Sequence, residues 1–275
     1  MDMDMDIGNY MKLALFNAEA MHKMRMLNGL YLRRPLMCLV DEAGSLELAS
    51  PEPFRLGFLL TTHPERLYYD INKLKAEIPP RSKSGEYHAR EDHPDTRNMI
   101  RALLCLNNDL LMYIVEWDKA DFSPDFFRNG RLTVMSDSNP LIASFAITAS
   151  HIAGAALANE NPSIDFIVEG SKVDISSEHR SREQAFKQVL PIAIQKQLQI
   201  KRPSMRTSTI IRILTRRKQE YPALSLVDHW LWAYCRYTDR GDETVFPEEL
   251  KRRTTIERMR ECDIRCNKDL GLGKS

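Results

Sequence analysis

The fold is decided by residues 35–44, which run Pro-Leu-Met-Cys-Leu-Val-Asp-Glu-Ala-Gly. A continuous apolar run of this length is typical of a strand that is buried on both faces. Two carboxylates and a turn glycine end the run, so the acids lie where ligand and catalytic groups gather in open α/β sheets. Successive strand residues point to opposite faces, so Asp41 and Glu42 cannot share one role while both remain in the strand. Asp41 is the better site candidate because it is the last residue continuous with the strand, and a solvated turn is the alternative.

Apolar runs and helical spacing farther along the chain predict an α/β protein with a mixed central sheet flanked by helices. The turn Pro-Glu-Pro at 51–53 should join the first two strands as a hairpin. Strands are expected at 35–41, 54–61, 110–117, 163–170 and 209–215, and helices at 10–30, 64–78, 94–107, 140–157, 178–199 and from 223.

The expected organisation is one domain with additions at both ends. An N-terminal extension and helix take up residues 1–34, the domain takes up 35–245, and a charged helical tail follows at 246–275. The predicted helix at 10–30 is rich in methionine, which suits an adaptable surface that packs on the domain or binds a protein partner. Nothing in the sequence indicates the oligomeric state.

Composition indicates a cytoplasmic globular protein. Hydrophobic residues make up 43% and charged residues 28% of the chain, and the net charge of +1 does not by itself indicate nucleic-acid binding. The five cysteines are odd in number and lie mostly in apolar runs, which fits reduced thiols. No apolar run reaches the roughly 18 residues needed to cross a bilayer, so no membrane association is expected. Cys262 and Cys266 lack further ligands at zinc-site spacing.

Three acids stand out by their setting. Asp41 and Glu169 end apolar strands, and Asp228 is an isolated acid inside Leu-Val-Asp-His-Trp-Leu-Trp. A buried acid is costly unless it is paired, protonated or bound to a metal, and without a partner its pKa should be raised. Hard cations such as Mg²⁺ and Mn²⁺ prefer carboxylate oxygens, and a pair of them can stabilise both oxygens of a phosphodiester displacement. Acids on a first strand, a later strand and a terminal helix are the RNase H-like arrangement.

The motifs together resemble the domain-of-unknown-function family numbered 3800. They are Asp-Glu-Ala-Gly after the first strand, Gly-Glu-Tyr-His-Ala at 85–89, a later strand ending in an acid, and Leu-Ser-Leu-Val-Asp-His-Trp-Leu-Trp-Ala-Tyr at 224–234. The similarity covers residues 35–240, and members of the family resemble RNase H-like nucleases. The chain departs from the family pattern at Ala43, where serine is usual, and at Val227, where alanine is common.

The resemblance implies a role for each motif residue. Asp41 matches the first acid, Glu86 or His88 the second, Glu169 the strand acid and Asp228 the helix acid. The expected function is hydrolysis of phosphodiester bonds in DNA or RNA, with the first, strand and helix acids as Mg²⁺ or Mn²⁺ ligands. Glu86 or His88 would position water or transfer a proton. The alternative is a catalytically weak or inactive nucleic-acid-binding or effector-scaffold protein. The setting in which members of the family occur suggests a role in mobile-element biology or phage defence.

A basic stretch carries the main nucleic-acid signal. Lysine and arginine residues cluster at 196–218, although the chain as a whole is nearly neutral. They could contact a phosphate backbone, or they could form a solvated face. The candidate contacts are Lys172, Lys201, Arg202, Arg206, Arg212, Arg216, Arg217 and Lys218.

Overall fold

The computed structural model describes residues 34–45, 47, 49–82, 85–128, 131–132, 145, 148–149, 151–153, 163–169 and 210–260. The helices predicted at 10–30 and 178–199, and the tail beyond residue 260, lie outside these residues. The long strands and helices are β1 (Leu36–Ala43), β2 (Phe54–Thr61), α2 (Pro64–Glu77), α3 (Pro94–Leu106), β3 (Leu111–Trp117), β6 (Ser163–Glu169), β7 (Ile210–Arg216), α7 (Leu224–Arg240), α8 (Glu248–Arg252) and β8 (Thr254–Arg258). Short 3₁₀ turns lie at Lys119–Asp121, Pro124–Phe126 and Glu243–Val245, and β4 (Phe127–Arg128) pairs with β5 (Arg131–Leu132).

In the described part of the chain, the central sheet has six strands in the order β7-β6-β1-β2-β3-β8. β2 runs antiparallel to both of its neighbours, β1 and β3, so the predicted hairpin of the first two strands is confirmed. On the other side of β1, β6 runs parallel to it and β7 runs parallel to β6, while β8 runs parallel to β3. The predicted mixed α/β sheet flanked by helices is therefore confirmed.

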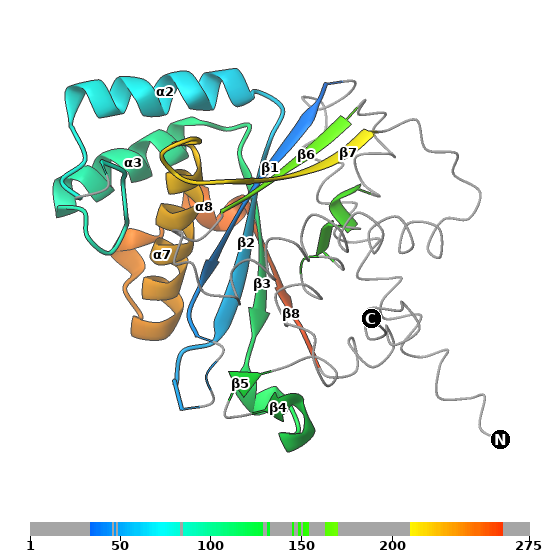
Figure 1. Ribbon diagram of the computed structural model, residues 1–275. Coiled ribbons are helices and arrows are strands. Elements are labelled where there is room, and N and C mark those ends of the chain that lie inside the picture. The colour runs from blue at the N-terminus through cyan, green and yellow to red at the C-terminus, as the bar shows by residue number, and fades with distance from the viewer. Residues whose placement is uncertain are drawn as a thin grey trace.

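Two apolar layers cover the two faces of the sheet, because successive strand residues alternate between them. Leu36, Cys38 and Val40 of β1 pack into one layer, which also contains Phe145 and Ile152. The other layer is formed with α2, α3, α7 and α8, which gather on one side of the sheet in Figure 1. Met37 and Leu39 of β1 face that helical layer, and by the same alternation Asp41 faces it too.

The end of β1 differs from the prediction, because the strand continues through Ala43. Pairing with β2 extends to this point, whereas pairing with β6 stops at Val40 and Val168. Gly44 then ends the strand in the left-handed region, with a φ of 82°, and a Cβ there would lie 1.9 Å from the carbonyl oxygen of Pro53. Both acids after Val40 are therefore strand residues, with Asp41 buried toward the helices and Glu42 exposed.

The segment after residue 245 also differs from the expected helical tail. Its helix, α8, is only five residues long, and β8 joins the edge of the main sheet beside β3. The sequence Thr254-Thr255-Ile256 is rich in β-branched residues, which favour strands. Trp230 of α7 donates a hydrogen bond from Nε1 to Oγ1 of Thr254 at 3.0 Å, which joins this strand to the helical layer.

A glycine in β2 lets α7 lie close against the sheet. Gly57 is the β2 partner of Asp41 in the strand register. A Cβ on Gly57 would come within 2.9 Å of the Leu231 side chain of α7. Asp228 lies three positions before Leu231 on the same helix, so this close approach holds Asp228 near the end of β1. No described helix is both long and apolar enough to cross a membrane.

Candidate functional site

Three acidic side chains from three elements converge on one ammonium group. The Nζ atom of Lys218 lies 3.4 Å from Oδ2 of Asp41, 3.2 Å from Oε2 of Glu169 and 3.1 Å from Oδ2 of Asp228. Asp41 and Glu169 each lie one residue beyond the last β1–β6 pair, so strand register alone places them side by side. We call Asp41, Glu169, Asp228 and Lys218 the acidic centre.

Lys218 reaches the acidic centre from the turn between β7 and α7. The backbone amides of Glu220 and Tyr221 donate to the carbonyl oxygen of Arg217, at 3.0 and 2.8 Å, and these bonds close the turn. Only 6% of the Lys218 side chain is exposed, although Arg217 and Gln219 on either side are exposed. The sequence grouped Lys218 with the candidate nucleic-acid contacts, and the structure directs its side chain to acids that are distant in sequence.

Burial and charge act in opposite directions within the acidic centre. Burial raises the pKa of Asp41 well above its ordinary value; the charge of Lys218 opposes this, and the charges of Glu169 and Asp228 add to it. Burial also acts to lower the pKa of Lys218, but the three carboxylates outweigh it and raise that pKa. Three carboxylates and a single ammonium leave the centre with unneutralised negative charge, which Asp41 accommodates by holding a proton more tightly.

Asp228 is paired in the structure, whereas the sequence did not show whether it has a partner. Burial acts to raise its pKa, but the hydrogen bond from His88 and the charge of Lys218 outweigh burial, and the pKa of Asp228 lies below its ordinary value. The backbone amide of Ala89 also donates to its Oδ2 at 3.3 Å. The sequence predicted a raised pKa only if Asp228 had no partner. Because it is paired, the pKa is lowered instead.

His88 lies beside the acidic centre, with Nδ1 at 3.6 Å from Oδ2 of Asp228. Its other ring nitrogen, Nε2, is buried and has no hydrogen-bond partner among the described residues. The loop that carries His88 is fixed on both sides: Tyr87 donates to the carbonyl oxygen of Ile78 at 2.6 Å, and Arg97 donates to that of Ala89 at 3.2 Å. The histidine is therefore held in place, with one nitrogen still able to bond.

Glu86, the other candidate for the second acid, has a different partner. It is buried and forms an ion pair with Lys75 of α2, at 2.5 Å between Oε2 and Nζ. This pair joins the loop to α2 and directs the carboxylate to that helix. Of the two residues that the sequence left open, the structure brings His88 to the acidic centre.

Apart from Lys218, the predicted basic contacts divide into three groups. Arg216 and Arg217 are exposed at the end of β7, and Arg216 is the register partner of Glu169. Arg212 forms an ion pair with Asp165 on the neighbouring strand, at 2.6 Å. The other predicted contacts lie outside the described residues, and they are Lys172, Lys201, Arg202 and Arg206.

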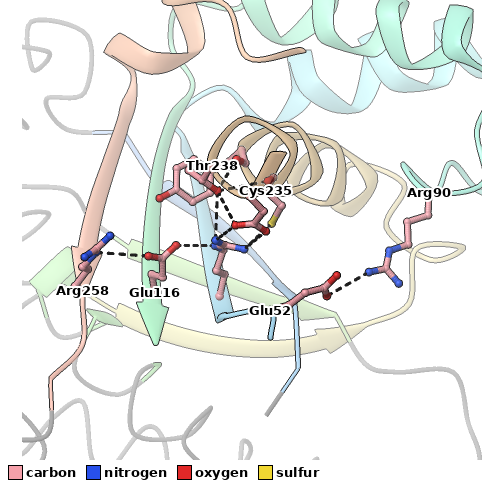
Figure 2. A network of polar contacts seen from close by, with 9 residues as sticks. Glu52, Arg90, Glu116, Cys235, Thr238 and Arg258 are labelled. Atoms are coloured by element: carbon pink, nitrogen blue, oxygen red, sulfur yellow. Dashed lines mark hydrogen bonds and ion pairs between the residues drawn. The ribbon is translucent and has the colours of Figure 1, made fainter. Parts of the chain in front are cut away.

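A second charged cluster, which the sequence analysis did not identify, holds the other end of α7. Arg55 of β2 donates to Glu116 of β3 at 2.7 Å and, through two nitrogens, to Asp239 of α7 at 2.6 and 2.9 Å. Glu116 also pairs with Arg258 at 3.6 Å, as Figure 2 shows, and Arg55 donates to Cys235 and Thr238 of α7 at 3.3 Å each. We call Arg55, Glu116, Asp239 and Arg258 the arginine cluster. Its sequence signal was a single charge inside each of two apolar strands.

A buried pair of His229 and Asp92 connects the 85–92 loop to the start of α7. Nε2 of His229 lies 3.0 Å from Oδ2 of Asp92, and Nδ1 of His229 lies 2.8 Å from the carbonyl oxygen of Ser225. Both side chains are almost fully buried. The pair fixes the loop against the helix, and in this way positions His88 beside Asp228. No local pattern predicted the pair, because Asp92 lies in a polar loop.

The acidic centre provides the donor types that hard cations bind, but its central position is taken. Carboxylate oxygens from three elements point at one cation, the Lys218 ammonium, so the acids do converge on a single point. Among the described residues, no group of three or more His, Cys, Asp and Glu side chains is arranged ready to hold a metal ion. The carboxylates fit a metal by type and direction, and binding one would require Lys218 to move.

Comparisons with known proteins leave the family open. No protein-family model matches the chain, and no curated protein matches it. Among solved structures, it is similar to ribonuclease H2 from Pyrococcus horikoshii OT3, with a TM-score of 0.35 and 13% identity over 79% of this chain and 92% of that chain. A similarity this low assigns neither a fold family nor an activity to the chain.

Proposed function

We propose that the protein is an RNase H-like nuclease that hydrolyses phosphodiester bonds in nucleic acid with the help of Mg²⁺ or Mn²⁺. The observation that carries the proposal is the convergence of Asp41, Glu169 and Asp228 from β1, β6 and α7 on one cationic group. The sheet plan supports it, because an antiparallel β1–β2–β3 unit is continued by parallel β6 and β7. The acids thus lie on a first strand, a later strand and a terminal helix.

The three carboxylates are the residues that would hold the metal. A bound divalent cation supplies Lewis-acid stabilisation of the phosphate oxygens and lowers the pKa of a bound water. Asp228 suits this role because its pKa is low, so it stays ionised and able to donate electron pairs. Asp41 would have to release its proton, which the high pKa of its carboxyl opposes until a cation is present.

His88 is the residue that would position water or move a proton. Its Nδ1 is directed to Asp228, and its buried Nε2 keeps an unused bonding position. A histidine held by a carboxylate is a common proton-transfer group in enzymes. Arg216 and Arg217 are exposed beside the strand that carries Glu169, and in this proposal they would contact the phosphate backbone.

The test is cleavage of labelled DNA, RNA and hybrid duplexes with Mn²⁺ by the wild type and by Asp228→Asn and Glu169→Gln. We expect cleavage by the wild type and a loss of at least about a hundredfold in each variant, because each removes a metal ligand. Glu42→Gln is the matched control, since Glu42 is the next residue in β1 and is exposed on the opposite face. Cleavage that survives both ligand substitutions would contradict the proposal.

A second function is favoured by one observation. Lys218 already provides a positive charge to the three acids, so the protein needs no metal to hold them together. This fits a scaffold that binds nucleic acid without efficient metal chemistry. Nucleic-acid binding by the wild type with no cleavage of any substrate in Mn²⁺ or Mg²⁺ would favour the scaffold over the nuclease.

A further inference from the structure

The Lys218 ammonium lies at the point where the three acids meet. It donates a hydrogen bond to Oδ2 of Asp228 at 3.1 Å, and it lies within ion-pair distance of Glu169 at 3.2 Å and of Asp41 at 3.4 Å. Lys75, by comparison, is paired with one acid, Glu86. Lys218 instead takes the central position that a shared cation would occupy.

A divalent ion and this ammonium exclude each other. Mg²⁺ binds carboxylate oxygens at about 2.0–2.1 Å, so an ion on the same three oxygens would lie almost on top of Nζ. Two cations at such a separation repel strongly, and the repulsion is little screened where the groups are buried. Metal can enter the acidic centre only if the ammonium leaves it.

The position of Lys218 makes departure feasible. The residue lies in a turn that follows the edge strand β7, and Arg217, Gln219 and Glu220 around it are all exposed. Its ammonium is the end of a flexible four-carbon stem, which can adopt other rotamers.

We propose that Lys218 is a tethered competitor of the divalent ion: it balances part of the negative charge of the acidic centre in the metal-free protein and is displaced when Mg²⁺ or Mn²⁺ binds. The inference rests on the proposed function, because it assigns a step to the same three acids. Lys218 lets the carboxylates stay together without metal, and it lowers the affinity for metal. The ion that enters must replace a cation that is always present at high effective concentration.

The first experiment is a calorimetric titration of the full chain with MnCl₂, without nucleic acid, for the wild type, Lys218→Met and Lys75→Met. Lys75 is the matched control, since it is a lysine paired with a buried acid outside the acidic centre. We expect the Mn²⁺ dissociation constant to fall by about tenfold or more in Lys218→Met and to stay at the wild-type value in Lys75→Met. Equal affinity in the wild type and Lys218→Met would overturn the inference and leave the nuclease proposal standing. Failure of Mn²⁺ to bind to either would overturn the nuclease proposal itself.

The second experiment uses only wild-type protein, so it can be carried out even if Lys218→Met does not fold. Wild-type protein is treated briefly with an amine-acetylating reagent, with and without Mg²⁺, and the modified lysines are identified by mass spectrometry. We expect Lys218 to react slowly without metal and several-fold faster with it, while the reactivity of Lys75 stays constant. Bound metal with Lys218 still protected would overturn the inference.

Discussion

The two ends of α7 are held by charged clusters of opposite design. In the arginine cluster, Arg55 and Arg258 face Glu116 and Asp239, so positive and negative charges balance. In the acidic centre, one lysine faces three carboxylates. The contacts to carboxylates differ in length as well: Arg55 bonds Glu116 and Asp239 at 2.6–2.9 Å, whereas Lys218 lies 3.1–3.4 Å from the three acids.

The difference separates a structural cluster from a functional one. A planar guanidinium that satisfies its donors with short, two-pronged bonds fixes geometry and leaves little for a ligand to improve. An ammonium shared among three acids leaves negative charge that a further cation could neutralise. Excess charge and a shifted carboxyl pKa are features typical of functional sites. Substitutions in one cluster can therefore be measured against the other as a reference.

The largest effect on stability is expected at the arginine cluster. Arg55→Met leaves two carboxylates without their buried partner, and loss of one member of a buried pair costs about 3–5 kcal/mol. Urea unfolding followed by circular dichroism measures this loss. Arg258→Met is the matched control, because Arg258 is an exposed partner of the same Glu116, and it should cost about 0–1 kcal/mol. Equal losses in the two variants would show that burial of Arg55 is not what stabilises α7.

Within the acidic centre, neutralising Asp41 and Asp228 should have opposite effects. Asp228 has a lowered pKa, so its contribution to stability is present above the ordinary Asp pKa and is lost as pH falls through its folded value. Asp41 has a raised pKa, so stability is lost as pH rises from the ordinary value to the folded one. In metal-free buffer near neutral pH, Asp228→Asn should lower the free energy of unfolding by about 1–3 kcal/mol.

Asp41→Asn should keep the neutral-pH stability of the wild type or raise it, and should remove the decline with rising pH. Urea unfolding at several values between about pH 4 and pH 9 measures both variants against the wild type. Changes of opposite sign in the free energy of unfolding of the two variants would agree with the charges described for the acidic centre. Equal destabilisation by the two variants would mean that the acidic centre is a balanced ion-pair cluster like the one at the other end of the helix.

The smallest effect is expected from the exposed arginines, and on binding only. Arg216→Glu with Arg217→Glu should weaken nucleic-acid binding and reduce the salt slope by roughly 0.9 for each phosphate that is no longer neutralised. The double variant should unfold at the wild-type temperature, because both side chains are exposed. Arg240→Glu, at the exposed C-terminal end of α7, is the control and should bind normally. Fluorescence anisotropy over a salt series distinguishes the two, and unchanged binding by the double variant would assign these arginines to a solvated face.

Much of the fold could be predicted because it depends on local patterns. The apolar runs of β2 and β6 and the helical spacing of α2 and α3 located these elements to within one residue. The short strand β8 was missed because its five residues, Thr-Thr-Ile-Glu-Arg, lie among charged neighbours and gain their stability from pairing with β3.

Only part of the candidate site could be predicted from the sequence. An acid that interrupts or ends an apolar run is conspicuous, and this signal identified Asp41, Glu169 and Asp228. The position of Lys218 depends on which strands are neighbours, so the sequence grouped it with Arg216 and Arg217. The choice between Glu86 and His88 likewise depended on Lys75, a tertiary partner that no motif shows.

The most direct test of metal binding at the acidic centre is a crystal structure of the full chain with Mn²⁺, in which anomalous scattering locates the metal. We expect Mn²⁺ bound to carboxylate oxygens of Asp41, Glu169 and Asp228 at roughly 2.0–2.3 Å, with the Lys218 ammonium withdrawn from them. Mn²⁺ bound elsewhere, or an acidic centre that keeps Lys218 in place at saturating Mn²⁺, would contradict metal binding by displacement of the lysine.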